Sequence, residues 1–176
     1  MTSRAIVLSV PYSGTHFTMK LLSLMGVEAE YTHFEPNWEY KIEARLLGMW
    51  PGERVILPYR PEADIAKSWH DRNIVLREYH QAWDVKDRLM PLISKVGFFM
   101  LPVERSMLRW EMVRALQTWL GVAHETELSS ELFTFIKDWP RVASWDPVKN
   151  DWRDESKKQL SGLMSSRMLK ENGNGT

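Results

Sequence analysis

The sequence predicts an α/β fold of three layers, with a mainly parallel central sheet between helices. Two observations predict it. Short apolar runs that end at turn residues occupy 5–10, 54–59 and 97–101, and each is followed by apolar residues at helical spacing. Buried strands that alternate with helices are typical of a parallel sheet covered on both faces, and ligands bind such sheets at the carboxyl ends of the strands.

The first third of the chain reads as strand, helix, strand and helix. The first strand, 5–10, is closed by Pro11, and the helix after Gly14 is marked by Phe17, Leu21, Leu24 and Met25. A second strand is expected at 27–32. A short helix is expected at 39–47, ending at Gly48.

The middle of the chain repeats this alternation. The strand at 54–59 has limited ladder bonds at its end because of Pro58, and Pro61 then suits the first turn of a helix. The apolar side of that helix is formed by Ile65, Trp69 and Leu76. A further helix is expected over 80–96, with a break near Pro91, before the strand at 97–101.

The clearest helix runs from Leu108 to Leu120 and ends at Gly121, because its apolar residues recur at helical intervals. Helices are also expected at 127–137 and 154–170, with a mixed loop at 139–153 between them. We expect one domain over residues 1–170 and a disordered polar tail at 171–176.

Composition limits the classes of function. The 176 residues, 44% of them hydrophobic, suit one globular domain. Lys plus Arg equals Asp plus Glu at 23 each, which gives no support for a general binder of nucleic acid or membrane surfaces. Cysteine is absent, so thiol chemistry and disulfides are excluded. No run approaches the roughly 18 apolar residues that span a bilayer, and we expect a cytoplasmic protein.

A candidate anion loop lies between the first strand and its helix. Ser13, Gly14 and Thr15 would offer hydroxyl donors and a close backbone approach at a helix start, where free N–H groups and the helix dipole favour an anion. A turn that merely caps an ordinary helix is the alternative. The nucleotide-triphosphatase motif Gly-x-x-x-x-Gly-Lys-[Ser/Thr] is absent.

The segment Pro11-Tyr12-Ser13-Gly14-Thr15-His16-Phe17 resembles the 5′-phosphosulfate loop of the sulfotransferases that use 3′-phosphoadenosine-5′-phosphosulfate, usually Pro-Lys-Ser-Gly-Thr-Thr-Trp. The resemblance implies a P-loop NTPase-like fold and places all seven residues at the donor. Tyr12 replaces the family's Lys and can donate one hydrogen bond without a full charge, whereas a protonated His16 could supply charge. Phe17 would stack on adenine, with core packing as the alternative.

A second segment, from Arg60 to Ser68, resembles the family's 3′-phosphate segment, Arg-x-Pro-x-Asp-x-x-x-Ser in outline. It has one residue fewer between Arg60 and Pro61, but the interval of eight from Arg to Ser is intact. A planar guanidinium and a hydroxyl can hold phosphate oxygens with directed hydrogen bonds. Taken singly, Arg60 would be a surface residue that forms an ion pair. Ser68 would be a solvated residue of a helix.

Two further blocks are similar to the family. Residues 101–105 and the helix that ends at Gly121 look like its Tyr-Glu-Asp strand end and following helix, with Val103 in place of Tyr. Residues 149–153 are similar to its Gly-Asp-Trp-Lys-Asn segment, behind which basic residues close over the 3′-phosphate. The resemblance thus makes candidates of Arg141, Lys149 and Arg153, which are otherwise ordinary charges on a loop.

The candidate catalytic base is His33. The segment Thr32-His33-Phe34-Glu35-Pro36 follows a predicted strand and resembles the family's Lys-Thr-His-x-Pro, which contains the catalytic His. Other branches use a Glu, so Glu35 is the second candidate. A hydrogen-bonded structural histidine is the alternative for His33.

The resemblance implies a sulfotransferase that moves a sulfuryl group in line to a hydroxyl or amine, with 3′,5′-adenosine bisphosphate as product. We expect a small-molecule or carbohydrate acceptor, bound by loops within 34–50 and 70–96, and no metal, because no His/Asp/Glu cluster has ligand spacing. The rivals are a P-loop-like small-molecule kinase and a catalytically impaired binding protein, which Tyr12 favours. Oligomeric state stays open.

Overall fold

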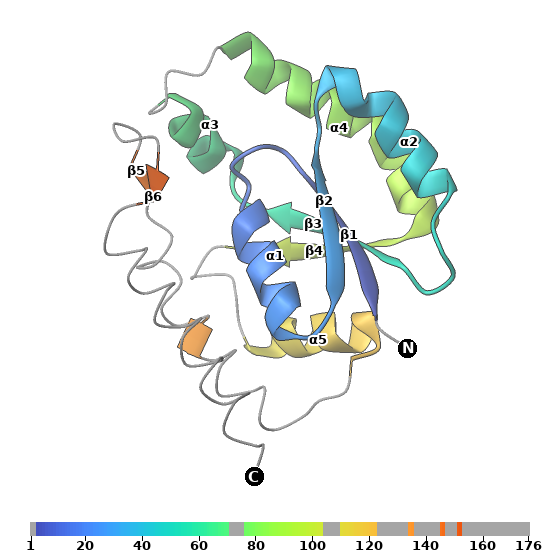
Figure 1. The fold of residues 1–176 in the computed structure, drawn as a ribbon. Helices are drawn as coiled ribbons and strands as arrows, with labels where there is room; N and C mark the ends of the chain where they lie inside the picture. The colour runs from blue at the N-terminus through green and yellow to red at the C-terminus, as the bar shows by residue number, and fades with distance from the viewer. Residues whose placement is uncertain are drawn as a thin grey trace.

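The computed structural model describes residues 3–70, 76–103, 110–122, 134–135, 145–146 and 151–152 (Figure 1). The strands are β1 (Arg4–Ser9), β2 (Glu28–His33), β3 (Arg54–Tyr59), β4 (Phe98–Pro102), β5 (Trp145–Asp146) and β6 (Asp151–Trp152). The helices are α1 (Thr15–Leu24), α2 (Glu39–Leu47), α3 (Glu62–His70), α4 (Leu76–Val96) and α5 (Trp110–Leu120), with a 3-10 turn, η1 (Pro36–Trp38). Within these ranges no helix is long and apolar enough to cross a membrane.

Four strands form one parallel sheet in the order β2-β1-β3-β4. This confirms the predicted α/β class with a parallel sheet flanked by helices. The register pairs Ser9, the last residue of β1, with His33, the last residue of β2. The carboxyl ends of the two strands therefore lie side by side, and the segment after β1 meets the segment after β2 at one edge of the sheet.

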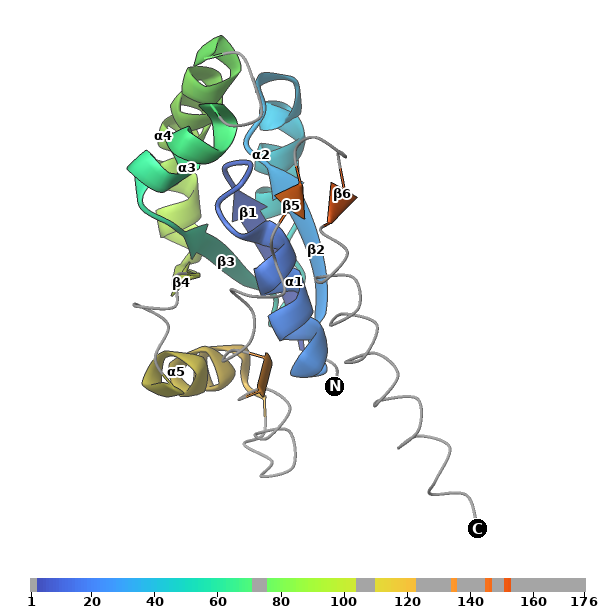
Figure 2. The same ribbon diagram turned by 90° about the vertical axis from the view of Figure 1, so that its left-hand side faces the viewer.

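Alternation along the strands divides the core into two layers. Ala5 and Val7 of β1 pack with the apolar sides of α1 and α5, whereas Ile6 and Leu8 pack with α2, α3 and α4. Figures 1 and 2 show the sheet between these two groups of helices. Both faces are covered, which explains why β1 and β3 read as continuous apolar runs.

Two expectations about helices were wrong. Leu76 begins α4 and is not part of α3, which ends at His70. Leu76 lies seven residues after Trp69, a helical interval, so spacing alone cannot assign Leu76 to one helix or to the next. Nor does the helix break near Pro91, because α4 continues to Val96. The buried side chains of Leu89 and Ile93 anchor it on both sides of the proline and outweigh the lost hydrogen bond.

The mixed loop predicted over 139–153 contains the antiparallel pair β5–β6. Thr134 and Phe135 are helical, as expected for 127–137. The remainder of that segment, the helix predicted at 154–170 and the tail at 171–176 lie outside the described residues.

Candidate functional site

The loop between β1 and α1 is a tight turn. The N–H of Ser13 donates to the carbonyl of Val10 at 3.1 Å, and Tyr12 and Gly14 have φ angles of 69° and 104°. A Cβ at Gly14 would lie 2.5 Å from Cγ2 of Val103, far inside van der Waals contact. Position 14 therefore requires glycine for two reasons. Its φ angle is positive, and Val103, which follows β4, approaches it closely.

Ser13 is the most unusual side chain of this loop. It is 2% exposed, and its Oγ has no hydrogen-bond partner among the described residues. A buried hydroxyl without a partner loses the free energy of its hydrogen bonds with water. It lies two residues before Thr15, the first residue of α1, where the N–H groups of the first turn have no partners within the helix. A buried hydroxyl and the N–H groups of a helix start thus lie close together in the chain, at a place where an anion would be stabilised.

Arg60 and Ser68 are in direct contact. Nη1 of Arg60 donates to Oγ of Ser68 at 3.0 Å and to the carbonyl oxygen of Tyr12 at 3.3 Å. Arg60 follows β3, and Ser68 lies two turns into α3, so the sequence interval of eight brings the pair together across the helix start. The two segments identified in the sequence therefore meet in space, joined by one guanidinium group.

Trp69 forms a second link between α3 and the loop. Its Nε1 donates to the carbonyl of Pro11 at 3.1 Å, and the ring of Tyr12 packs edge-on against its indole at a centroid distance of 5.7 Å. The indole also contacts Tyr79 of α4, with 5.5 Å between ring centroids. The carbonyls of Pro11 and Tyr12 are thus both bound by donors from the Arg60–Trp69 segment.

His33 lies against the start of α1. Its Nε2 is 3.3 Å from Oγ1 of Thr15, and that oxygen is 2.8 Å from Oγ of Ser9. Ser9 and Thr15 are buried, while the side chain of His33 is 30% exposed. A chain of two hydroxyls and an imidazole therefore connects β1, α1 and β2 at the carboxyl edge of the sheet.

The surroundings of His33 favour its neutral form. Burial lowers the pKa of its imidazole below the ordinary value of 6.5, and the nearby His16 lowers that pKa further. Its Nδ1 lies 3.9 Å from Oε1 of the half-exposed Glu35. The ring of Tyr31 lies near both histidines, with centroid distances of 5.4 Å to His33 and 6.5 Å to His16. A neutral imidazole near pH 7 is the form that a general base needs.

One predicted site residue packs in the core. Phe17 is 2% exposed and stacks on Phe135 at 5.4 Å, inside the core layer of α1 and α5. Its ring therefore lies in the core, which was the alternative to stacking on adenine, and the role that the resemblance implied stays a prediction. Arg141, Lys149 and Arg153 lie outside the described residues.

Two residues of the site were missed in the sequence. Ser9 is a buried hydroxyl at the end of an otherwise apolar strand, and that exception was the available signal. Trp69 follows Ser68 directly, but a tryptophan on the apolar side of a helix gives no indication that its indole N–H reaches a loop 58 residues earlier.

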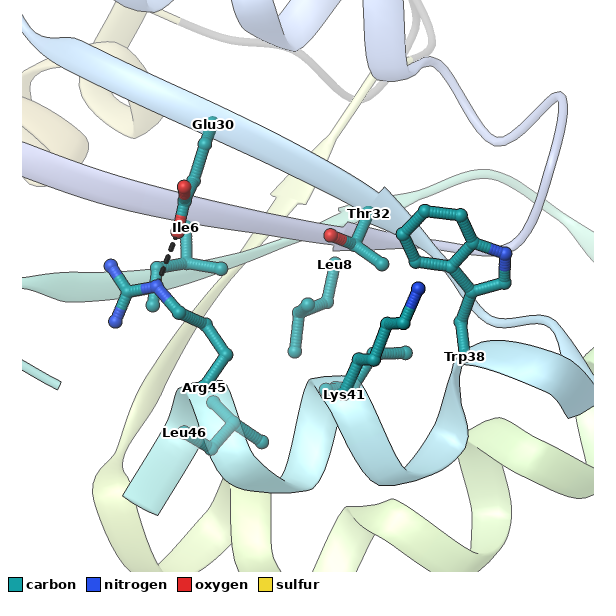
Figure 3. A pocket seen from close by; sticks show the side chains of 9 residues that line it. Ile6, Leu8, Glu30, Thr32, Trp38, Lys41, Arg45 and Leu46 are labelled. Carbon is teal, nitrogen blue, oxygen red and sulfur yellow. Dashed lines mark hydrogen bonds and ion pairs between the residues drawn. The ribbon is translucent and has the colours of Figure 1, made fainter. Parts of the chain in front are cut away.

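A cavity of about 230 Å³ lies on the opposite face of the sheet (Figure 3). Alternation along β2 directs Glu30 and Thr32 toward α2, while Tyr31 and His33 face α1. The cavity is lined by Ile6, Leu8, Glu30, Thr32, Trp38, Lys41, Ile42, Arg45 and Leu46. Trp38 and Lys41 come from the 34–50 segment predicted to bind the acceptor, but this cavity lies on the opposite face of the sheet from His33.

Among the described residues, no group of three or more His, Asp or Glu side chains is arranged to hold a metal ion. No protein-family model and no curated protein matches the chain. The geometry of the loop, the Arg60–Ser68 pair and His33 therefore carries the functional argument.

Proposed function

We propose that this protein binds 3′-phosphoadenosine-5′-phosphosulfate and transfers its sulfuryl group to a hydroxyl or amine acceptor, within the P-loop-like fold of that family. The contact of Arg60 with both Ser68 and the carbonyl of Tyr12 carries the proposal. This contact supports the proposal because it joins Arg60 and Ser68, which we assign to the 3′-phosphate, to the loop that we assign to the 5′-phosphosulfate. A nucleotide with phosphates at the 3′ and 5′ positions of its ribose is the ligand that needs two adjoining anion sites.

The two anion sites use different donors. At the loop, the N–H groups of the first turn of α1, which have no acceptor within the helix, and the buried hydroxyl of Ser13 would bind the 5′ end. At the clamp, both contacts of Arg60 use Nη1, and a guanidinium carries three more N–H donors on its other nitrogens. We assign the 3′-phosphate to those donors and the Ser68 hydroxyl, because a planar guanidinium forms directed hydrogen bonds with phosphate oxygens.

The transfer step needs one general base, which takes the proton of the acceptor. The acceptor oxygen or nitrogen forms a bond to sulfur as the bond from sulfur to the 5′-phosphate oxygen breaks. The acceptor proton passes to His33, which is neutral near pH 7 because burial and His16 lower its pKa. The products are the sulfated acceptor and 3′,5′-adenosine bisphosphate. Fixed donors of the loop stabilise the negative charge that develops on the leaving phosphate.

Thermal-shift and calorimetric titrations test the proposal. We expect 3′,5′-adenosine bisphosphate to raise the melting temperature more than ATP with Mg²⁺ does, because only the former occupies both anion sites. Arg60→Ala should lose most of the bisphosphate effect. The matched control is Arg88→Ala, which removes an exposed ion pair between Arg88 of α4 and Glu39 of α2. This variant should leave the effect of the bisphosphate unchanged.

Three outcomes would contradict the proposal. These are no binding of the bisphosphate, equal binding by Arg60→Ala, and a larger effect of ATP with Mg²⁺. The last would favour the kinase class. Binding without sulfation of any acceptor in a screen of small-molecule and carbohydrate alcohols would instead identify a binding protein.

A further inference from the structure

The hydroxyl of Thr15 is shared between residues of two strands. Its Oγ1 lies 2.8 Å from Oγ of Ser9 and 3.3 Å from Nε2 of His33. A hydroxyl has one hydrogen, so it can donate to only one neighbour at a time. If Thr15 donates to Nε2, the neutral ring of His33 carries its hydrogen on Nδ1. If His33 donates instead, the hydrogen is on Nε2, and Thr15 donates elsewhere.

An anion at the loop changes which direction is favoured. Thr15 is the first residue of α1 and lies two residues after Ser13, whose buried hydroxyl has no partner among the described residues, so an anion bound at this loop would attract the hydrogen of Thr15. Once that hydrogen points to the anion, the oxygen of Thr15 can only accept. Ser9 can still donate by rotating its hydroxyl. His33 can donate only when Nε2 carries a proton.

We propose that Thr15 is a positioning residue that couples occupancy of the anion loop to the protonation of Nε2 of His33. With the loop empty, Thr15 donates to Nε2. With the loop occupied, Nε2 carries a hydrogen and donates to Thr15, which leaves the lone pair of the neutral ring on Nδ1. This inference rests on the proposed function for the identity of the anion, and it makes Nδ1 the nitrogen that accepts the acceptor's proton.

The groups around His33 are consistent with this role for Nδ1. Nδ1 lies 3.9 Å from the carboxylate of Glu35, which would stabilise the imidazolium formed when the proton arrives. Within the part of the chain that the structure describes, the other titratable groups near the ring are His16 of α1 and Tyr31 of β2, and β1 contributes the hydroxyl of Ser9, through Thr15. Since His16 disfavours positive charge on the ring, Glu35 is the group here that favours it.

Nitrogen-15 NMR of the imidazoles tests the coupling directly, because the two neutral tautomers and the cation have distinct shifts. The His33 signals are assigned with His33→Gln, and spectra are recorded at pH 7.5 with and without saturating 3′,5′-adenosine bisphosphate. In the wild type we expect Nε2 to be unprotonated in the free protein and protonated in the complex. Thr15→Ser should behave like the wild type, whereas Thr15→Val should show no ligand-dependent exchange of tautomers.

The outcomes separate this inference from the proposed function. If the bisphosphate moves the amide signal of Gly14 but the His33 ring keeps one tautomer, the coupling is wrong and donor binding stands. If Thr15→Val switches as the wild type does, Thr15 is not the coupling group. If no loop amide responds to the bisphosphate, the proposed function is overturned and the coupling with it.

Discussion

At Gly14 the backbone and its surroundings both require the absence of a side chain. The sequence predicted a glycine that lets a phosphate approach, since it lies between two hydroxyl residues after a strand. The structure adds that Val103, at the end of β4, occupies the place of a side chain. That contact joins distant parts of the chain, so no local pattern could predict it.

Replacing this glycine should destabilise the fold more than replacing a glycine with the same backbone preference in open space. Gly26→Ala, at φ 70° with nothing near its Cβ, should lower the free energy of unfolding by about 1 kcal/mol. Gly14→Ala should lower it by a further ~1–3 kcal/mol, because Val103 must move. Urea denaturation measures both, and equal losses would show that the Val103 contact is easily relieved.

The protonation of His33 should make stability depend on pH. The unfolded chain titrates this group near 6.5 and the folded protein at a lower pKa, because burial and His16 disfavour its charge. Between the two values the unfolded state binds more protons, so the free energy of unfolding falls as the pH drops below about 6.5. In His33→Gln the difference in urea midpoint between pH 7.5 and 5.5 should shrink. His80→Gln, at an exposed position of α4, should retain the full difference.

At the scale of elements, α3 is the part that holds the loop. The sequence predicted this helix from Pro61 and its apolar spacing, and predicted that Arg60 and Ser68 act together. It did not show that Trp69 reaches back to the carbonyl of Pro11. Periodicity identifies which side of a helix is buried, but not which loop the buried side meets.

Removing the indole N–H should therefore weaken ligand binding while leaving the fold intact. Trp69→Phe keeps an aromatic ring in the core but loses the hydrogen bond to Pro11. With a net contribution of about 0.5–1.5 kcal/mol for one such bond, we expect the Kd for the bisphosphate to rise by roughly two- to tenfold. Trp83→Phe on α4 is the control. An unchanged Kd in Trp69→Phe would mean that the loop needs no support from α3.

A buried carboxylate fixes the end of α2 to the start of β3. Glu53 is 7% exposed, accepts hydrogen bonds from two nitrogens of Arg45 at 3.0 and 2.6 Å, and accepts one from the N–H of Trp50 at 2.7 Å. The hydrogen bonds from Arg45 hold the pKa of this carboxyl below its usual range. An amide in its place has one oxygen and no charge, so it could not accept hydrogen bonds from both nitrogens of Arg45 or neutralise the guanidinium.

Glu53→Gln should thus lower the free energy of unfolding at pH 7 by about 1.5–3 kcal/mol. The wild-type advantage should diminish as acid protonates the carboxyl, because the stability from a lowered pKa is full above the unfolded value and is lost as the pH falls through the folded pKa. Glu39→Gln, which breaks the exposed pair with Arg88, should have a much smaller effect in the same denaturation series. Equal effects of the two variants would contradict the role of burial.

At the scale of the whole molecule, the sequence predicted the layers of the fold but not the order of the strands within the sheet. Apolar strands and helical spacing predicted the parallel sheet, but the order β2-β1-β3-β4 depends on packing between distant segments. The same holds for the site. Ser13, Thr15, Arg60 and Ser68 could be predicted from their chemistry and the resemblance. The hydroxyl of Ser9 was missed, and the burial of Phe17 against Phe135 depends on a contact between segments far apart in the chain.

The central claim is that this fold brings a clamp for a 3′-phosphate against an anion loop. Calorimetry of the wild type and Arg60→Ala with 3′,5′-adenosine bisphosphate and with adenosine 5′-monophosphate tests it most directly, because the two ligands differ only in the 3′-phosphate. We predict that the wild type binds the bisphosphate at least about tenfold more tightly, as expected for charge-assisted hydrogen bonds. Arg60→Ala should lose this preference. Equal affinity of the wild type for the two ligands, or a preference that survives in Arg60→Ala, would contradict the claim.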